Sequence, residues 1–312
     1  MKWAPHPFTL RQLQYVIAVA DKSSFRAAAE TCHVAQPSLS AQIAQVEEAL
    51  SFQLFERDRR NVTLTAAGRS FVARARSLLI AADDLWELSQ GLSDPFAATL
   101  RIGVIPTIGP YLLPEVAPAL RKRYPKLSFV WNEDKTVLLL ERLSRAELDG
   151  AILALEADVG DLPHVVIGTD PFVFAAPAGH PLAAGHGPLK PEQLDGEPVL
   201  LLDDGHCFRD QALAVCTRGG AAEAEFRATS LSTLVQMAAS GAGVTLLPSL
   251  AVPLENRRQA LQVRPFAPKA PGRTLALVYR KGSALETPLR AVGETLSAEY
   301  ARFSARSSPR KR

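Results

Sequence analysis

The sequence of 312 residues is long enough for more than one hydrophobic core, and its 47% hydrophobic and 21% charged residues are typical of a globular protein. The formal net charge is +3, but five basic residues of the C-terminal tail, Arg302, Arg306, Arg310, Lys311 and Arg312, supply +5 and leave the remainder at −2. This distribution excludes a generally basic protein, so any contact with nucleic acid has to come from locally placed residues.

The opening residues and the cysteine content indicate the compartment. The run MKWAPHPFTL is interrupted by prolines and lacks the apolar centre of a signal peptide, and no apolar run approaches the ~20 residues that span a bilayer. We therefore expect a cytoplasmic protein with no membrane partner, in which ordinary thiols stay reduced. Three cysteines do not form a disulfide framework there, so each is inert, metal-bound or redox-active.

Residues 1–66 are predicted to form a winged helix-turn-helix domain. Residues 9–12 have the capping-box pattern of a helix start, and a second short helix is expected at about 23–32, with Cys32 as a small hydrophobic residue. After a tight turn near His33, Pro37 stands where a third helix should begin. One buried stripe is expected on that helix, formed by Leu39, Ile43, Val46 and Leu50. The run NVTLT, residues 61–65, is a plausible wing strand.

The opposite face of the expected third helix is polar but uncharged. A face that served only solvation would usually carry Lys and Glu, whereas short amides and hydroxyls fit base edges in a major groove. Helix-turn-helix pairs also occur in proteins that never touch DNA. Arginines that follow the helix would contact phosphates and set the register. The predicted DNA contacts are Gln36, Pro37, Ser38, Ser40, Gln42, Arg57 and Arg60.

Residues 67–95 are predicted to form a linker helix and hinge. Thr65 can cap a helix from about 66 to 92, which Asp94-Pro95 ends. A heptad seam runs along it through Phe71, Ala75, Leu78, Ala82, Leu85, Ser89 and Leu92. Such a seam either packs on its own domain or forms a dimer contact. We expect a dimer, whose two-fold symmetry would place two recognition helices on two half-sites.

Residues 96–302 are predicted to form an α/β sensor. Short β-rich runs alternate with helical stretches, which favours a mostly parallel sheet with helices on both faces. The runs expected to be strands are TLRIGVI, KLSFVWN, DGAILAL, PFVFAAP, PVLLL, AEFRAT, GVTLLP and RTLALVY. This number of strands predicts two subdomains that share a cleft, at 98–169 with 274–302 and at 170–273. Residues 303–312 are expected to be a basic, solvated tail.

The run DGHCFRDQALAVC, residues 204–216, places two of the three cysteines nine residues apart. Residues 203–205 are typical of a turn that leads into a helix, which would put Cys207 near a helix N-terminus, where the helix dipole favours a thiolate. Arg209 would add positive charge. An inert pair, a zinc site and a reactive thiol all remain open. Zinc is the weakest of these because the segment lacks CxxC or HxxxH spacing, so no metal or cofactor is expected.

At this point the sequence resembles a known family. The run SFRAAAETCHVAQPSLSAQIAQVEEALSFQLFERDRRNVTLTAAG resembles the DNA-binding region of the LysR-type transcriptional regulators. The runs IPTIGPYLLP, DGHCFRDQALAVC and FRATSLSTLVQMAASGAGVTLLPSLAVP resemble the peroxide-sensing branch of that family. The resemblance covers nearly the whole chain from about Leu10. It implies a winged helix-turn-helix, a linker helix and a two-subdomain sensor like those of periplasmic binding proteins.

The resemblance also implies partners and residue roles. Promoter DNA and RNA polymerase would be partners of a homodimer or homotetramer, hydrogen peroxide the signal, and glutaredoxin or thioredoxin the reductant. Cys207 would be the peroxidatic cysteine and Cys216 the resolving one. The other pocket residues would be Thr107, Thr136, His206, Arg209 and Asp210. Some relatives carry a histidine before the FRATS run, where Glu225 stands here, so a mechanism that needs a histidine at that position is not expected.

The spacing of the two cysteines then has a consequence. On one continuous helix nine residues span about 13 Å and half a rotation, whereas a disulfide needs Cα atoms within roughly 7 Å. The segment would have to unfold locally before the bond forms, and we predict a reversible redox switch that controls antioxidant genes. Two alternatives stay open: a regulator driven by a metabolite, and a thiol peroxidase with a DNA-binding appendage. The context of Cys207 argues against the first, and the helix-turn-helix against an enzyme.

Overall fold

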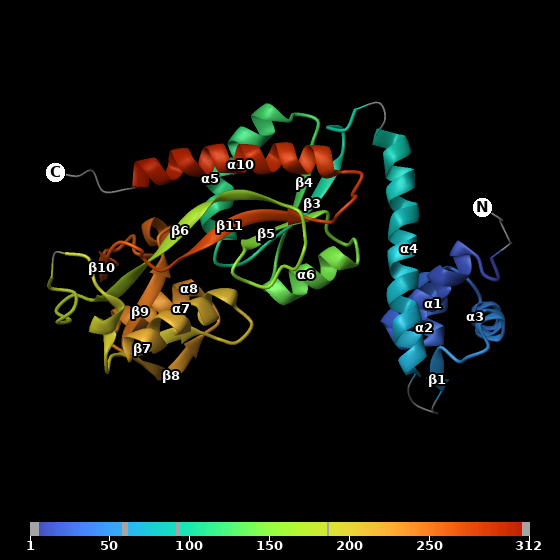
Figure 1. Cartoon of the computed structure of the whole chain (residues 1–312), viewed down its shortest axis with the longest axis horizontal. Coiled ribbons are helices and arrows are strands. Elements are labelled where there is room, and N and C mark those ends of the chain that lie inside the picture. The colour runs from blue at the N-terminus through green and yellow to red at the C-terminus, as the bar shows by residue number, and fades with distance from the viewer. Residues whose placement is uncertain (1–5, 58–61, 92–93, 186, 308–312) are drawn as a thin grey trace. The chain divides into compact units, whose positions relative to one another are not determined.

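A computed structural model describes residues 6–57, 62–91, 94–185 and 187–307 (Figure 1). Its contacts divide the chain into a unit of residues 1–90 and a unit of residues 91–312, and each is described by itself. Within the described ranges, no helix combines the length and the apolar character needed to cross a membrane.

The first unit contains the predicted helix-turn-helix. Its elements are α1 (Leu10–Lys22), α2 (Phe25–Thr31), α3 (Gln36–Leu50), β1 (Phe55–Arg57) and β2 (Val62–Leu64). The capping box at Thr9 is confirmed. The second helix begins at Phe25 rather than 23, because Ser23 takes a left-handed conformation that ends α1 and Ser24 then caps α2. The wing is also confirmed, since β1 and β2 pair antiparallel.

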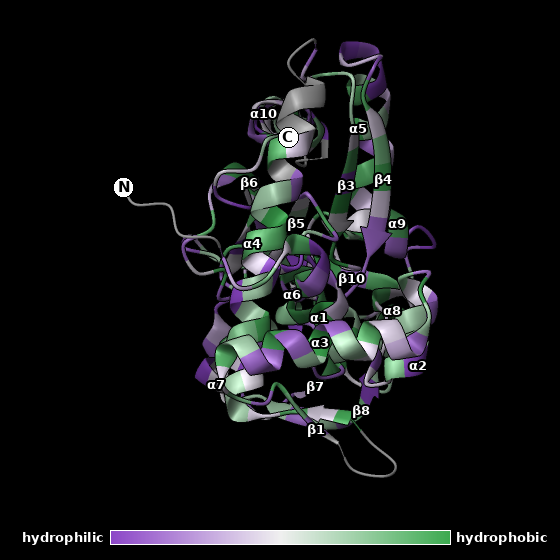
Figure 2. Ribbon diagram, turned by 90° about the vertical axis from the view of Figure 1, so that its right-hand side faces the viewer, coloured by the Kyte–Doolittle hydropathy of each residue, from purple (hydrophilic) through white to green (hydrophobic). Residues whose placement is uncertain are grey.

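The third helix has the expected two faces. Leu39, Ile43 and Val46 are fully buried in the core of this unit. Hydrophobic and hydrophilic residues lie side by side along α3 (Figure 2). The buried face fixes the helix against α1 and α2, so its polar face points away from the core.

The long helix α4 (Ala66–Gly91) follows the wing. Thr65 caps it as predicted, because its Oγ1 accepts a hydrogen bond from the Gly68 N–H at 2.8 Å. Along the predicted seam, Ala75 is buried, but Leu78 and Leu85 are 47% and 70% exposed. Leu78 and Leu85 of the seam are therefore uncovered in the single chain, while the side chain of Ser89 and the whole of Leu92 lie outside the described part of the structure.

The second unit is a nine-stranded sheet with helices around it. Its strands are β3 (Thr99–Val104), β4 (Ser128–Glu133), β5 (Gly150–Ala154), β6 (His164–Pro177), β7 (Pro198–Leu202), β8 (Ala222–Ala228), β9 (Val244–Pro248), β10 (Leu261–Pro265) and β11 (Gly272–Tyr279). Its helices are α5 (Gly109–Arg123), α6 (Thr136–Ser144), the short 3-10 helix Pro191–Leu194, α7 (Cys207–Gly219), α8 (Leu231–Ala239), α9 (Val252–Glu255) and α10 (Glu286–Ser307). The strand order is β4-β3-β5-β11-β6-β9-β7-β8, with β10 paired to β6.

The prediction of a mostly parallel sheet is only half right. Strand β3 is parallel to β4 and β5, and β7 is parallel to β8 and β9, as βαβ connections require. The prediction is wrong at the centre, where β11 runs antiparallel to β5 and β6, and β6 antiparallel to β9 and β10. These central strands carry the chain between the two ends of the sheet, so no βαβ crossover sets their direction.

Strand β6 joins the two ends of the sheet. It begins at His164, seven residues before the predicted run, and residues 164–171 pair with β11. Residues 172–177 pair with β9 and β10. Helix α10 lies along β6 and beside α5, while α7 and α8 lie against β7, β8 and β9 (Figure 1). One strand is therefore common to both regions that carry the candidate site.

Candidate functional site

The site is built on the turn that leads into α7. Gly205 has φ +89°, a conformation that favours glycine, and a Cβ there would lie 3.1 Å from the side chain of Lys135. His206 is the N-cap, and Cys207 is the first helical residue, which confirms its expected place at a helix N-terminus. The Cys207 thiol is free and half-buried. It is therefore reachable while lying at the positive end of the helix dipole.

Cys207 lines a narrow pocket, and side chains fill nearly all of it in this state. The cavity lies where α7 begins, between the loop after β3 and the start of α6. Its lining residues are Ile105, Pro106, Thr107, Lys135, Thr136, His206 and Cys207. The structure thus brings together four of the residues that the sequence predicted, from segments 29 and more residues apart.

The hydroxyl of Thr107 is held by a buried arginine. Arg273, on β11, is fully buried and donates from Nη1 to Thr107 Oγ1 at 2.6 Å and from Nη2 to its backbone oxygen at 2.8 Å. The same guanidinium donates to Asp170 Oδ2 at 3.0 and 3.1 Å. Because the Thr107 oxygen accepts from Arg273, its own hydrogen is oriented away and can be donated to a molecule in the cavity.

Thr136 presents the second hydroxyl. The residue is 5% exposed, and its Oγ1 is buried with no hydrogen-bond partner among the described residues. A buried polar atom without a partner costs roughly 1–3 kcal/mol. Its position in the cavity wall means that a small polar ligand would supply the missing hydrogen bond.

Lys135 and His206 form the polar side of the cavity, with Asp203 behind them. Lys135 Nζ lies 3.1 Å from Asp203 Oδ2 and donates to the backbone oxygen of Asp204 at 2.7 Å. His206 Nε2 lies 3.0 Å from Asp203 Oδ1. Burial lowers the pKa of His206, and the charge of Lys135 lowers it further against the opposing effect of Asp203. The imidazole is therefore neutral near pH 7, and Lys135 is the charged residue of the lining, with Asp203 balancing its charge.

Arg209 and Asp210 do not line this cavity. Arg209 is buried, and its guanidinium donates to Asp204 Oδ1 at 2.8 Å and to Glu223 at 3.2 Å. Arg227 pairs with the same two carboxylates, and hydrogen bonding to Arg209 lowers the pKa of Asp204. Asp210 is exposed on the first turn of α7. Arg209 thus ties the turn before α7 to β8 rather than reaching the thiol.

Cys216 lies on the same continuous helix as Cys207. It is 2% exposed, and burial raises the pKa of its thiol to about 11. At 1.5 Å of rise per residue, nine residues separate the two Cα atoms by about 13 Å along the helix axis. In this state the two sulfurs are unable to bond, and Cys216 is a protonated, covered thiol.

Two residues of the site were missed by the sequence analysis. Lys135 stands directly before Thr136, so a basic residue next to a predicted pocket threonine was the available signal. Arg273 opens the apolar run RTLALVY, where a charge at the start of a buried strand was the signal. Glu225, which stands where some relatives have histidine, is exposed on β8 and does not line the cavity.

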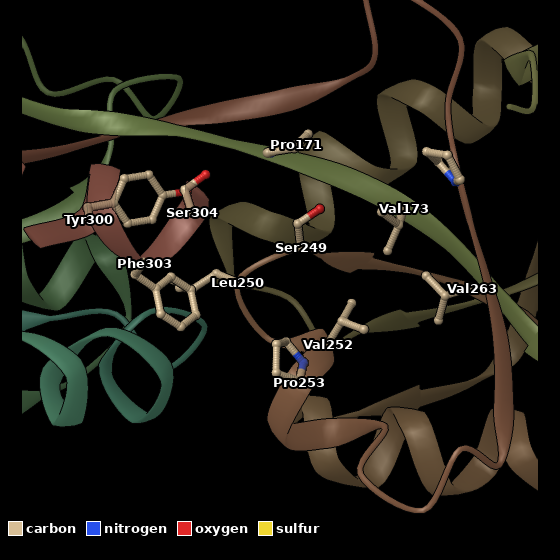
Figure 3. Close-up of a pocket in the computed structure, with 11 residues that line it drawn as sticks. Pro171, Val173, Ser249, Leu250, Val252, Pro253, Val263, Tyr300, Phe303 and Ser304 are labelled. Carbon is tan, nitrogen blue, oxygen red and sulfur yellow. The ribbon is translucent and has the colours of Figure 1, made fainter. Parts of the chain in front are cut away.

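A separate cavity of about 370 Å³ lies between the end of α10, the loop after β9, and α9 (Figure 3). It is lined by Pro171, Val173, Ser249, Leu250, Val252, Pro253, Val263, Pro265, Tyr300, Phe303 and Ser304. None of these residues is charged or a cysteine. This cavity fits an apolar molecule and has no thiol chemistry.

The predicted DNA contacts lie on and after α3. Gln36, Pro37 and Ser38 are exposed in its first turn, while Ser40 and Gln42 are half-buried. Arg57 is the last residue of β1, with its side chain outside the described part of the structure, and Arg60 lies outside the described residues altogether. The exposed first turn of the second helix of such a pair is the part that enters a major groove.

Fold and site together define a regulator with a helix-turn-helix unit and a separate sensor unit. Residues 10–69 match the family "Bacterial regulatory helix-turn-helix protein, lysR family", and residues 93–301 match the "LysR substrate binding domain". A Dickeya chrysanthemi protein named "Hydrogen peroxide-inducible genes activator" is 41% identical over 96% of this chain and 99% of its own length.

Solved structures give the closer assignment. A full-length OxyR variant from Pseudomonas aeruginosa matches with a TM-score of 0.75 at 35% identity, over 94% of this chain and 95% of that one. A Corynebacterium glutamicum OxyR mutant described as H2O2-bound matches with a TM-score of 0.66 at 32% identity, over 97% and 96%. The chain belongs to the LysR family of bacterial regulators, in its OxyR branch.

Proposed function

We propose that this protein is a DNA-binding transcriptional regulator that senses hydrogen peroxide through Cys207. The observation that carries the proposal is the cavity in which a helix-N-terminal thiol faces two buried hydroxyls and a lysine. A second cysteine lies nine residues along the same helix. The names of the similar proteins, as peroxide-inducible activators and a peroxide-bound OxyR, support the same signal. The protein acts as a switch rather than as a turnover enzyme.

The first step is oxidation of the Cys207 thiolate. The sulfur attacks one oxygen of H2O2, an S–O bond forms, the O–O bond breaks, and the second oxygen leaves as hydroxide with the electron pair of the broken bond. Sulfur is oxidised and peroxide is reduced. The Cys207 sulfur lies at the start of α7 in a pocket whose lining includes Lys135, and the hydroxyls of Thr107 and Thr136 are placed to donate to the peroxide oxygens as charge develops.

The second step is condensation with Cys216. Its thiol attacks the Cys207 sulfenic acid, so that an S–S bond forms, the S–O bond breaks and water leaves. Because both residues lie on α7, this step requires the helix to unwind in part, which also uncovers Cys216. The remodelled sensor then changes the DNA contacts. A dithiol reductant of the thioredoxin or glutaredoxin class resets the bond.

The remaining parts of the proposal concern assembly and place of action. The uncovered seam of α4 supports a homodimer, and two such dimers would form the homotetramer. The polar face of α3 would bind promoter DNA, where RNA polymerase is the further partner. Since promoter DNA lies in the bacterial cytoplasm, we place the protein there, with antioxidant genes as its targets.

The experiment is a thiol map by mass spectrometry before and after low-micromolar peroxide, run beside a promoter footprint. We expect one equivalent of peroxide to produce a Cys207–Cys216 bond and a changed footprint, and Cys207→Ser to abolish both. No such bond and no changed footprint in the wild type would contradict the proposal. Continuous consumption of peroxide with a thiol reductant, at many turnovers per chain, would instead indicate a thiol peroxidase.

The apolar cavity beside α10 favours one alternative, a regulator that responds to a small apolar metabolite. In that case the footprint of Cys207→Ser would still change when the inducer is added. The absence of any cysteine from the lining of that cavity separates the two mechanisms clearly.

A further inference from the structure

Phe208 follows Cys207 directly and is 1% exposed. Its ring lies at 85° to the ring of Phe172, on β6, with ring centroids 5.1 Å apart. The guanidinium carbon of Arg273 lies 5.7 Å from the centroid of the Phe208 ring. Both contacts are favourable, since aromatic pairs prefer edge-to-face packing and a cation over a ring face is attracted to it.

Arg273 connects this contact to the opposite wall of the cavity. The same guanidinium that faces Phe208 donates to Thr107 Oγ1 and to Asp170. The first turn of α7 is therefore joined through one buried cation to the hydroxyl that faces Cys207 across the cavity. While Phe208 stays in place, the thiol and the Thr107 hydroxyl keep their spacing.

The disulfide is incompatible with this position of Phe208. The Cα atoms of Cys207 and Cys216, about 13 Å apart on the helix, must come within roughly 7 Å. Phe208 is bonded to Cys207 and lies between the two cysteines in the sequence, so unwinding the first turns of α7 withdraws its ring from Phe172 and Arg273. The reduced arrangement and the bonded arrangement therefore compete for this one side chain.

We propose that Phe208 is a positioning residue that separates the two steps of the switch. With its ring in place, Cys207 is held in the cavity for oxidation by peroxide. Release of the ring is the event that permits condensation with Cys216. The inference rests on the proposed function and adds to it a residue that sets how readily the sulfenic acid converts to the disulfide. It also sets how far the dithiol form is favoured over the disulfide.

The test compares Phe208→Leu with the wild type. Leucine is apolar and a good helix former, so α7 keeps its start, but the flat ring that faces Arg273 is lost. We expect sulfenic acid to convert to disulfide about tenfold faster, while the first oxidation is no faster than in the wild type. The dithiol–disulfide equilibrium should shift about tenfold toward the disulfide, which corresponds to ~30 mV in the reduction potential.

The measurements are rapid-mixing kinetics with a sulfenic-acid trap and equilibration in glutathione buffers of known potential, on the full-length protein. Phe174→Leu is the matched control, because Phe174 is also fully buried on β6 and its ring faces that of His180. Phe174→Leu should lower thermal stability without changing the ratio of the condensation rate to the rate of the first oxidation, and without changing the reduction potential of the cysteine pair. If Phe208→Leu does not fold, Phe208→Met replaces it.

Equal shifts in both variants, or a shift in neither, would overturn the inference and show that Phe208 is an ordinary core residue, while the proposed function stands. A wild-type protein that forms no Cys207–Cys216 bond would overturn the proposed function and this inference with it.

Discussion

At the scale of single residues, two threonines line one cavity but are held in opposite ways. Thr107 Oγ1 accepts a hydrogen bond from a buried arginine, whereas Thr136 Oγ1 has no partner among the described residues. A sequence identifies both threonines only through resemblance to a family. It does not show which hydroxyl is occupied, because Arg273 is 166 residues from Thr107.

Replacement of each threonine by valine should therefore have different effects. Thr136→Val removes a buried hydroxyl without a partner, so the protein should be at least as stable as the wild type, yet react with peroxide about tenfold or more slowly. Thr107→Val leaves Arg273 Nη1 unpaired and should also lower the free energy of unfolding by about 2 kcal/mol. Denaturant unfolding and the rate of sulfenic-acid trapping measure the two effects. Equal stability losses would contradict the assignment.

The lowered pKa of His206 predicts a dependence of stability on pH. The folded state resists protonation of this imidazole, whereas the unfolded chain takes up the proton near the ordinary histidine pKa of about 6.5. Stability should therefore be unaffected by this group above about pH 7 and should fall as the pH drops below about 6.5, until the lower folded pKa is reached. In His206→Gln this part of the decline should be missing from thermal unfolding curves between pH 8 and 5. Parallel curves for the two proteins would contradict the predicted contribution of His206 to the pH dependence of stability.

At the scale of elements, α7 combines a reactive start with a covered interior. Cys207 lies at the N-terminus of α7 because the Asp-Asp-Gly turn comes just before it. This is a local pattern, so the sequence alone predicts it. Strand β7 was predicted to the residue because PVLLL is a continuous apolar run. Strand β10 was not predicted, because LQVRP mixes polar and apolar residues and takes its place from pairing with β6. Lys135 was missed for a similar reason, since its partners lie 68 and 69 residues away.

Oxidation should loosen α7 in particular. Amide protons of residues 207–216 should lose protection in hydrogen exchange when the protein is oxidised, because the bond requires the helix to unwind. In Cys216→Ser, peroxide stops at the sulfenic acid, and the protection should remain. Mass-spectrometric exchange on both oxidised proteins gives the comparison. Unchanged protection in the oxidised wild type would mean that α7 does not unwind.

In the reduced protein, Cys216 should resist alkylation at pH 8, since it is buried and the pKa of its thiol is raised to about 11. Mass spectrometry after timed alkylation measures this. The reactivity of Cys216 should appear only as the pH approaches that value or as the protein unfolds. Labelling of Cys216 at pH 8 as fast as that of Cys207 would contradict its burial.

At the scale of the whole molecule, the chain consists of two units, and we propose that the exposed seam of α4 is a surface for self-association. The division into a helix-turn-helix and an α/β sensor was visible in the sequence, because helical periodicity changes to alternating strands after residue 95. The antiparallel centre of the sheet was not visible, since it depends on pairings between distant segments, such as Gly150 with Tyr279, 129 residues apart, at the end of the β5–β11 ladder.

The exposed seam of α4 predicts the effect of a charge within it. Leu85 is 70% exposed, and Leu85→Glu should weaken dimerisation by about tenfold or more, because a carboxylate would be buried in the contact. Binding to a two-half-site promoter should weaken with it. Ser77→Glu, at an exposed position of α4 off the seam, is the control and should stay dimeric. Sedimentation and a DNA-binding titration measure both, and a dimeric Leu85→Glu protein would place the contact elsewhere.

The position of both cysteines on one helix also bears on how long the oxidised form would persist after a pulse of peroxide. A bond between them would close a ring of about ten residues, and so short a ring removes less disorder from the unfolded chain than a longer ring would. The bond therefore has less stability of its own to set against the helix and the packing that it disrupts. The native contacts of α7, which the disulfide disrupts, favour the dithiol form over the disulfide form. The oxidised state should persist only while peroxide outruns the cellular reductants, so the signal ends soon after its cause.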